Sequence, residues 1–116
     1  MHFKLIMVIV EDADAPALCE VARQEGATGS TVISQARGEG MVPQRTFFGL
    51  DLEARRDVIM LLVEEHLSRR ILEAIGRVGE FDEHPGRGIA FQIDVEDAVG
   101  VMMQERTLQK SVEEEL

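Results

Sequence analysis

The chain has 116 residues, enough for one domain with a modest core and too few for two. Its formal net charge of −10 argues against direct nucleic-acid binding, which needs clustered lysine and arginine, and no segment reaches the roughly 20 apolar residues of a membrane span. Cys19 is the single cysteine, which excludes an internal disulfide, and the N-terminus has no cationic leader, so the sequence predicts a cytoplasmic protein that is not integral to a membrane.

Two segments, residues 5–10 and 58–63, are apolar at every position. Because side chains alternate between the two faces of a strand, an unbroken apolar strand needs cover on both faces. The chain shows only two helices of useful length, and two helices cover one face of a small sheet. We therefore expect the other face to be buried against copies of the same chain, with functional sites between subunits.

The first half of the chain predicts a strand, a helix and a second strand. The first strand is expected over residues 3–11. The sequence from Asp12 to Pro16 is typical of a helix start, since aspartate caps helices well and proline is tolerated in the first turn. Gly26 is expected to end this helix, and residues 28–37, rich in Thr, Val, Ile and Ser, to form the second strand.

The second half begins with residues 38–55, a long connection without a clean period, and loops of this length are often functional. The second apolar run is the third strand and ends near Glu64. An amphipathic helix follows, with Ser68 facing outward and Leu67, Ile71, Ala74, Ile75 and Val78 facing inward. After a loop over residues 79–88, the alternation of residues 89–95 predicts the fourth strand, and residues 98–103 could add a short one.

The element order is β-α-β-β-α-β. It predicts an α+β, ferredoxin-like sandwich, in which two helices cover one face of an antiparallel sheet and the first and third strands are the central pair. Those are the two strands that are apolar on both faces, so pattern and topology agree. We expect a single domain over residues 1–103, followed by a polar tail over residues 104–116.

The same order, with a long connection before the third strand and a glycine-containing loop before the fourth, resembles the nitrogen-regulatory P-II signalling family from about residue 3 to residue 103. The resemblance is carried by residues 25–32, 36–40 and 47–50 (EGATGSTV, ARGEG and FFGL), with a weaker match over residues 85–91. It implies a homotrimer that is not an enzyme. It also implies that inter-subunit clefts bind an adenine nucleotide and that the 38–55 loop docks on a transporter, enzyme or transcription regulator.

The resemblance implies a set of ligand-binding residues around each cleft. They come from the segment after the first helix, the ends of the second and third strands, and the loop before the fourth strand: Thr28, Gly29, Ser30, Thr31, Arg37, Gly38, Val63, Gly86, Arg87 and Gly88. Glycine-rich loops can present backbone amides to anions, and arginine can contact phosphate through two nitrogens. No cofactor is required, and the effector would be ADP, AMP, cyclic AMP or ATP.

The chain departs from the family where the phosphates would lie. The family's loop reads Thr-Gly-Lys-x-Gly-Asp-Gly-Lys, whereas residues 82–89 read Asp-Glu-His-Pro-Gly-Arg-Gly-Ile, and the family's two late arginines fall on Gly100 and Met102. The tyrosine that many members carry on the mobile loop is missing, because the chain has no Tyr. The lost positive charge favours a less charged ligand, such as a monophosphate, a cyclic nucleotide or an unrelated molecule.

Other interpretations remain open from the sequence. Arg37 and Arg87 could bind an anion or pair with nearby carboxylates, and His84 beside Asp82 and Glu83 is more typical of a solvated loop than of a metal site. No nucleophile is paired with a base at a recognised spacing, so no catalytic residue is predicted. The alternatives to a P-II-like regulator are a CutA-like trimer that binds divalent metal and a ferredoxin-like small-ligand module or enzyme.

Overall fold

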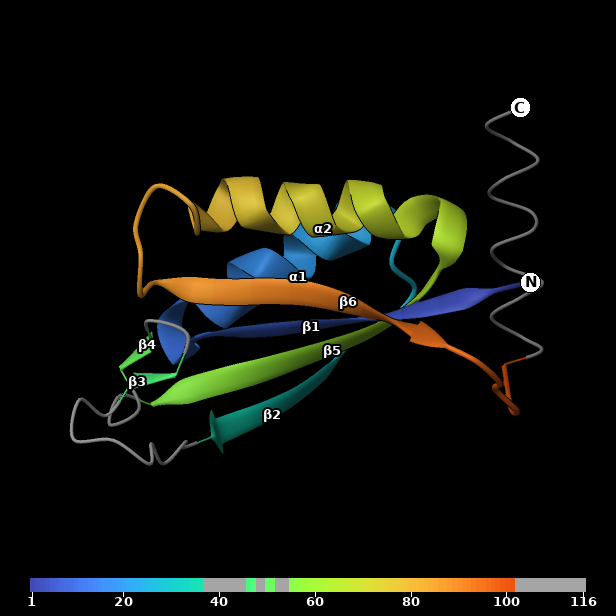
Figure 1. The fold of residues 1–116 in the computed structure, drawn as a ribbon, viewed down its shortest axis with the longest axis horizontal. Helices are drawn as coiled ribbons and strands as arrows, with labels where there is room; N and C mark the ends of the chain where they lie inside the picture. The colour runs from blue at the N-terminus through green and yellow to red at the C-terminus, as the bar shows by residue number, and fades with distance from the viewer. Residues whose placement is uncertain (37–45, 48–49, 52–54, 102–116) are drawn as a thin grey trace.

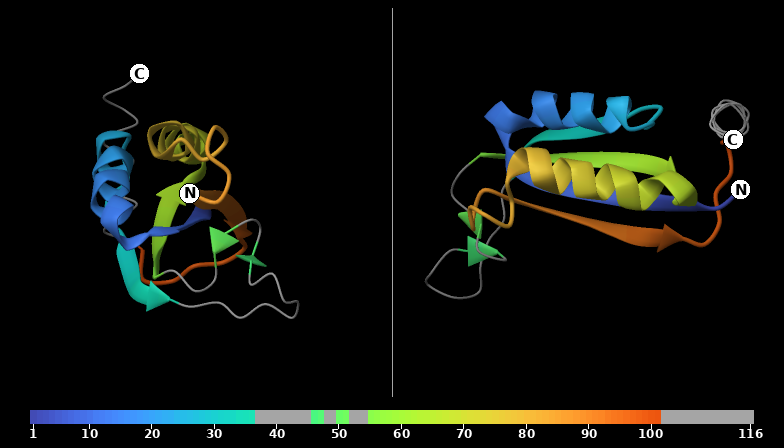
Figure 2. Two further views of the ribbon diagram at one scale, coloured as in Figure 1. Left: turned by 90° about the vertical axis from the view of Figure 1, so that its left-hand side faces the viewer. Right: turned by 90° about the horizontal axis from the view of Figure 1, so that it is seen from above.

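The computed structural model describes residues 1–36, 46–47, 50–51 and 55–101. The elements, in chain order, are β1 (Phe3–Glu11), η1 (Asp12–Asp14), α1 (Ala15–Gln24), β2 (Thr31–Ala36), β3 (Thr46–Phe47), β4 (Leu50–Asp51), β5 (Arg56–Glu64), α2 (Glu65–Gly79) and β6 (Gly88–Val95). Both long helices lie on the same side of the sheet (Figure 1) and run side by side over it (Figure 2). No helix in these ranges is long and apolar enough to cross a membrane.

The main sheet has four strands in the order β2-β5-β1-β6. Every neighbouring pair is antiparallel, and β1 pairs along its length with both β5 and β6. The predicted α+β, ferredoxin-like sandwich is therefore confirmed, including the central position of the first and third long strands. In the connection before β5, the described residues form the short antiparallel pair β3–β4. Residues 38–45, 48–49 and 52–54 of that connection, and the tail at residues 104–116, lie outside the described residues.

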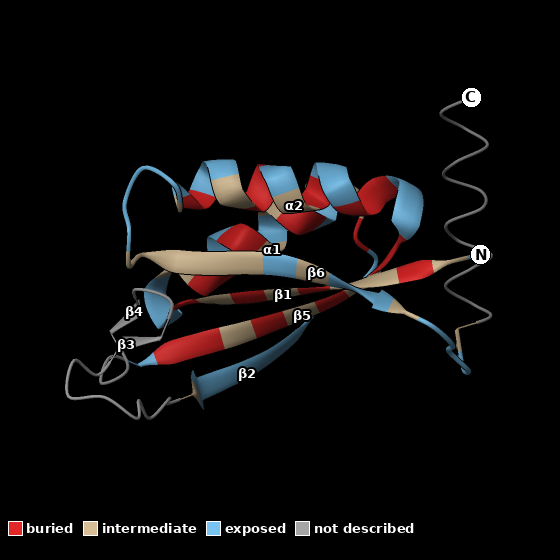
Figure 3. Cartoon of the chain, in the orientation of Figure 1, coloured by how far each residue is buried: buried red, intermediate tan, exposed pale blue. Residues whose placement is uncertain are grey.

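The core lies between the helices and one face of the sheet (Figure 3). On the two central strands every second side chain is buried, and the apolar faces of the two helices pack against these side chains. The fully buried members include Ile6, Val8, Val10, Leu18, Ile59, Leu61, Ile71 and Ile75. These residues follow the period of 2 expected for strands and the period of 3.6 expected for helices.

The opposite face of the sheet is apolar, and neither of the helices in the described ranges covers it. Cross-strand register places ten apolar side chains on this open face: Leu5, Met7, Ile9, Ile33, Val58, Met60, Leu62, Ile89, Phe91 and Ile93. The outer strands leave Ile33 48%, Phe91 37% and Ile93 47% exposed. The two helices thus cover one face only, as the sequence predicts, and the other presents the contiguous apolar surface typical of an association site.

Four sequence expectations are wrong in detail. The second strand begins at Thr31, because residues 28–30 form no ladder, and residues 98–101 form no further strand. Ser68 is buried rather than outward, and its hydroxyl is satisfied by donating to the carbonyl of Glu65 at 2.9 Å. Val78 is 47% exposed rather than in the core. The ring of Phe81 covers the last turn of α2 at Gly79, not at Val78.

Candidate functional site

The segment after α1 begins with a tight helix ending. Gly26 has φ +113°, a left-handed conformation that favours glycine, and the amides of Gly26 and Ala27 donate to the carbonyls of Arg23 and Ala22. This ending turns the chain so that Thr28, Gly29 and Ser30 are exposed and border a hollow of about 230 Å³ beside α1. Three of the ten predicted ligand-binding residues therefore share one concave surface.

Two charged residues of α1 form the polar side of this hollow. Arg23 donates to Glu20 through Nε at 3.0 Å and also through Nη2. That hydrogen bond lowers the pKa of the Glu20 carboxyl and raises the pKa of Arg23. Cys19, half-buried, lies on the same wall and packs against the core, as expected for a small core residue. Val63, in contrast, is buried in the sheet at this end and can contribute only its backbone to a surface ligand.

The loop before β6 contains a reverse turn at His84–Arg87. The amide of Arg87 donates to the carbonyl of His84 at 3.1 Å, Pro85 is the second residue, and Gly86 is the third with φ +91°. Proline followed by a residue of positive φ is the pattern of a type II turn. Gly86 is therefore required by the turn geometry, independently of any ligand.

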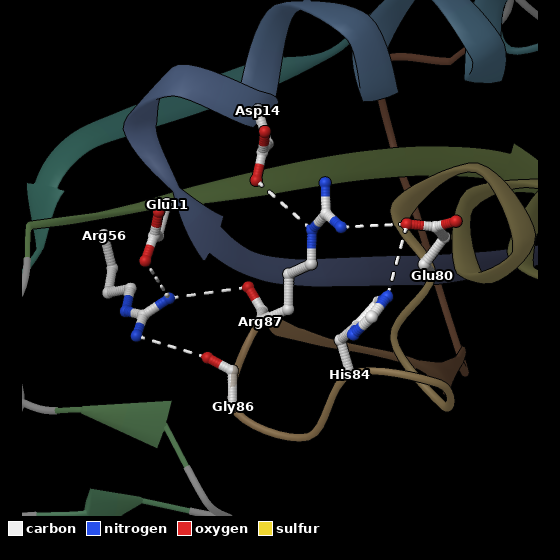
Figure 4. A network of polar contacts seen from close by, with 7 residues as sticks. All are labelled: Glu11, Asp14, Arg56, Glu80, His84, Gly86 and Arg87. Atoms are coloured by element: carbon white, nitrogen blue, oxygen red, sulfur yellow. Dashed lines mark hydrogen bonds and ion pairs between the residues drawn. The ribbon is translucent and has the colours of Figure 1, made fainter.

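Arg87 is engaged by carboxylates of the same chain (Figure 4). Its Nη1 donates to Oε2 of Glu80 at 2.9 Å, and its Nε lies 3.9 Å from Oδ2 of Asp14. His84 approaches the same Glu80 oxygen at 3.7 Å. Of the two interpretations left open for this arginine, pairing with carboxylates describes the isolated chain, so an anionic ligand would have to compete with Glu80 and Asp14.

The sequence indicates a solvated charge cluster at Arg55-Arg56, beside Asp51 and Glu53, but this expectation is wrong for Arg56, which is buried and anchors this loop. Its side chain is 6% exposed, and its guanidinium donates to the carbonyls of Arg87 at 3.5 Å and Gly86 at 3.4 Å and approaches Glu11 at 3.9 Å (Figure 4). The only sequence signal was the Arg55-Arg56 pair at the start of a hydrophobic strand, a pattern more typical of a solvated charge cluster.

Gly88 has a packing role. A Cβ built on it would lie 2.4 Å from Cε1 of Phe81, and one built on Gly79 would lie 2.5 Å from the same atom. The ring of Phe81 thus occupies the space that side chains at both glycines would need. Phe81 also lines a hollow of about 500 Å³ between α2 and the start of β6, with Arg69, Leu72, Glu73, Gly76, Arg77, Asp82, Glu83, Gly88, Ile89 and Ala90.

The predicted ligand residues fall at opposite ends of the sheet. Thr31 pairs with Met60, which places residues 28–30 beside the end of β5 that carries Val63. Gly88 pairs with Val10, which pairs on its other side with Asp57 at the beginning of β5. Val63 lies six residue steps along the strand from Asp57, about 20 Å at roughly 3.3 Å per step. Arg37 and Gly38 lie outside the described residues, as do Met102 and residues 38–45 of the long connection.

One group in the described ranges has metal-ligand spacing: Glu64, Glu65 and His66, at the start of α2. Glu64 is 3% exposed, and its carboxylate accepts from the backbone amide of His66 at 2.8 Å and contacts Nδ1 of the same residue at 2.5 Å. That contact raises the pKa of His66. The carboxylate is thereby occupied in capping the helix, so this group gives no support to a CutA-like metal site.

Comparison with known proteins agrees with this architecture. A model of the family described as nitrogen regulatory protein P-II matches residues 3–105. The chain belongs to the P-II family. The resemblance detected in residues 25–50 and in the element order is thus confirmed, and members of this family are regulatory proteins. No protein of curated function matches the chain.

Three solved structures illustrate the similarity. One, described as a PII-like signalling protein from Thermus thermophilus, is 26% identical, with a TM-score of 0.60 over 82% of this chain and 87% of that one. The apo form of CPII, a nitrogen regulatory PII-like protein from Thiomonas intermedia, is 20% identical, with a TM-score of 0.62 over 82% and 90%. CPII bound to ADP, AMP and acetate is 22% identical, with a TM-score of 0.59 over 83% and 90%. The CPII structures support the fold.

Proposed function

We propose that this P-II-family chain is a homotrimeric regulator that binds an adenine nucleotide in clefts between its subunits. The observation that carries the proposal is the separation of the predicted ligand residues. Thr28, Gly29 and Ser30 lie about 20 Å from Gly86 and Arg87, measured along β5, so one small ligand cannot touch both groups in one chain. Two copies can bring one group from each chain to the same cleft.

The open apolar face supplies the driving force for such assembly. One face of the sheet carries ten apolar side chains, and three of them, at its margins, are 37–48% exposed. In a monomer this surface would remain exposed to water. Burial of apolar surface contributes about 25 cal/mol per Å², so copies that cover this face are strongly stabilised. Three copies packed through the same face would set the 28–31 segment of one against the 84–88 loop of its neighbour.

Adenine nucleotides are the proposed effectors because the PII-like protein CPII has been solved with ADP and AMP. In this chain Arg87 is paired with Glu80 and Asp14, and the loop lacks the family's lysines. We therefore propose that AMP, ADP or cyclic AMP is favoured over ATP, because a triphosphate would bring the most negative charge to a loop with little free positive charge.

Signal output is proposed to pass through residues 38–55 to a partner protein, with ligand contacts biasing that connection between states. The proposed role is regulatory rather than catalytic, and the proposed location is the cytoplasm. The nature of the partner, whether transporter, enzyme or transcription regulator, follows from the family resemblance alone.

A calorimetric panel of AMP, ADP, cyclic AMP and ATP on the full chain tests this proposal, with sedimentation velocity on the same samples. We expect trimers and saturable binding, with ATP the weakest of the four. Two findings would contradict the proposal. One is a stable monomer at micromolar concentration, because it would have no shared cleft, and the other is a trimer that gives no heat with any nucleotide.

A further inference from the structure

One buried charged group has no role in the fold or in the proposed cleft. Asp57, near the beginning of β5, is 6% exposed, and no described residue forms a hydrogen bond with its Oδ1. Burying an ionised carboxylate without a partner is costly, and nearly all buried polar atoms in proteins are satisfied. An orphaned carboxylate oxygen at this depth therefore points to a partner outside the described residues.

The neighbours of Asp57 follow from the register of the sheet. Asp57 pairs with Val10 on β1, and Val10 pairs on its other side with Gly88 on β6. Because side chains alternate along a strand, Asp57 shares the helix-facing side with Ile59 and Leu61, whereas adjacent Arg56 points to the other side. The helix-facing side at this end is where Arg87 reaches across toward Asp14, at the start of α1 (Figure 4).

The charges at this end of the sheet do not balance. Among the described residues, ion pairs join two guanidinium groups, those of Arg56 and Arg87, to three carboxylates, those of Glu11, Asp14 and Glu80. These three carboxylates already contact an arginine (Figure 4), and Asp57, the neighbour of Arg56 in the chain, adds a fourth negative charge.

We propose that this end of the sheet is a cation-binding subsite, in which the Asp57 carboxylate contacts the bound cation. A positive charge is the partner that an orphaned carboxylate in a surplus of negative charge binds best. A hard divalent metal suits carboxylate oxygens, and an organic ammonium group suits the same acceptors through its N–H donors. The subsite does not depend on nucleotide binding, so it can exist whether or not the proposed effector is correct.

The test measures cation binding by the full chain, its Asp57→Asn variant and a matched control, Glu73→Gln. The control removes one negative charge from an exposed helix position that pairs with Arg69. Each protein is titrated calorimetrically with Mg²⁺, Ca²⁺ and putrescine at constant ionic strength, since a chain of net charge −10 attracts all cations. Thermal unfolding with each cation is recorded in parallel, because a ligand that binds the folded state raises the melting temperature.

We expect one of the two cation classes to bind wild type and Glu73→Gln alike. Asp57→Asn should bind about tenfold or more weakly, the loss expected for one charge-assisted contact, and should show no melting shift with that cation. The metal and diamine arms identify which class binds. Equal shifts in all three proteins, or no heat in wild type with any cation, would overturn the subsite. If Asp57→Asn does not fold, the wild-type titration and the variant Asp57→Glu, which keeps the charge, decide the question.

Discussion

Gly88→Ala is the sharpest perturbation of the loop that resembles a phosphate site, because the structure assigns that glycine to packing. An added Cβ would lie 2.4 Å from Cε1 and 2.8 Å from Cζ of Phe81. Ordinary carbon contacts are about 3.5–4.0 Å, so the ring must move by about 1 Å or more. Overpacking of this kind costs about 1–3 kcal/mol. The backbone at Gly88 does not have positive φ, so strain adds nothing to this cost.

The assay is thermal and urea unfolding at fixed protein concentration, since assembly would make stability concentration-dependent. We expect Gly88→Ala to lose about 1–3 kcal/mol and the matched control Gly29→Ala, which has no atom within 4 Å of its Cβ, to change little. In a double-mutant cycle, Phe81→Leu should recover most of the loss at Gly88. The packing explanation is refuted if Gly88→Ala is as stable as wild type, or if its cost is unchanged when Phe81 is leucine.

Three further substitutions test other parts of the structure. Phe91→Asp puts a charge on the open apolar face, and sedimentation should show smaller species than wild type. Val78→Asp, on the outer side of α2, should leave assembly intact. If the two variants sediment alike, the open face is not the proposed interface. Gly76→Ala should stabilise the chain by about 1 kcal/mol in chemical unfolding, because its Cβ meets nothing within 4 Å and alanine is the better helix former; destabilisation would contradict the helix geometry. The pKa of His66, followed by NMR, should lie above 6.5 and fall in Glu64→Gln. Because the folded-state pKa is raised, the stabilisation by this pair is fully present below about pH 6.5 and is lost as pH rises through the folded value, and an unchanged titration in Glu64→Gln would exclude the pair as the cause.

The sequence predicted the elements whose signals are local or strictly periodic. The unbroken apolar runs at residues 5–10 and 58–63 became the central strands, and Gly26 ended its helix with a positive φ. The expected exposure of Ser68 and burial of Val78 were wrong because a helical period shows which way a face points. It does not show how much of that face neighbouring elements cover. At the end of α2 the cover is the ring of Phe81 beside Gly79, a contact from outside the helical period.

The candidate site was less predictable, because the function of a charged residue depends on its partners. Arg87 in a glycine-rich loop fits a phosphate ligand by residue type. Its partners Glu80 and Asp14 are 7 and 73 positions away, and no local pattern links the second of them to the loop. The expectation of a solvated Arg56 was wrong for the same reason, since its acceptors are backbone carbonyls 30 and 31 positions along the chain.

These contacts change what the acidic substitutions in the loop mean. Without the family's lysines, the loop is held by internal bonds: Arg56 to its carbonyls, Arg87 to Glu80 and the His84–Arg87 turn. A loop that binds phosphate through free cations is organised by its ligand, whereas this one is already organised in the chain alone. A nucleotide at this position would therefore have to break the Arg87–Glu80 pair, or bind through backbone amides and the neighbouring copy. The second route needs no free cation, so it is the one consistent with the proposed cleft between subunits.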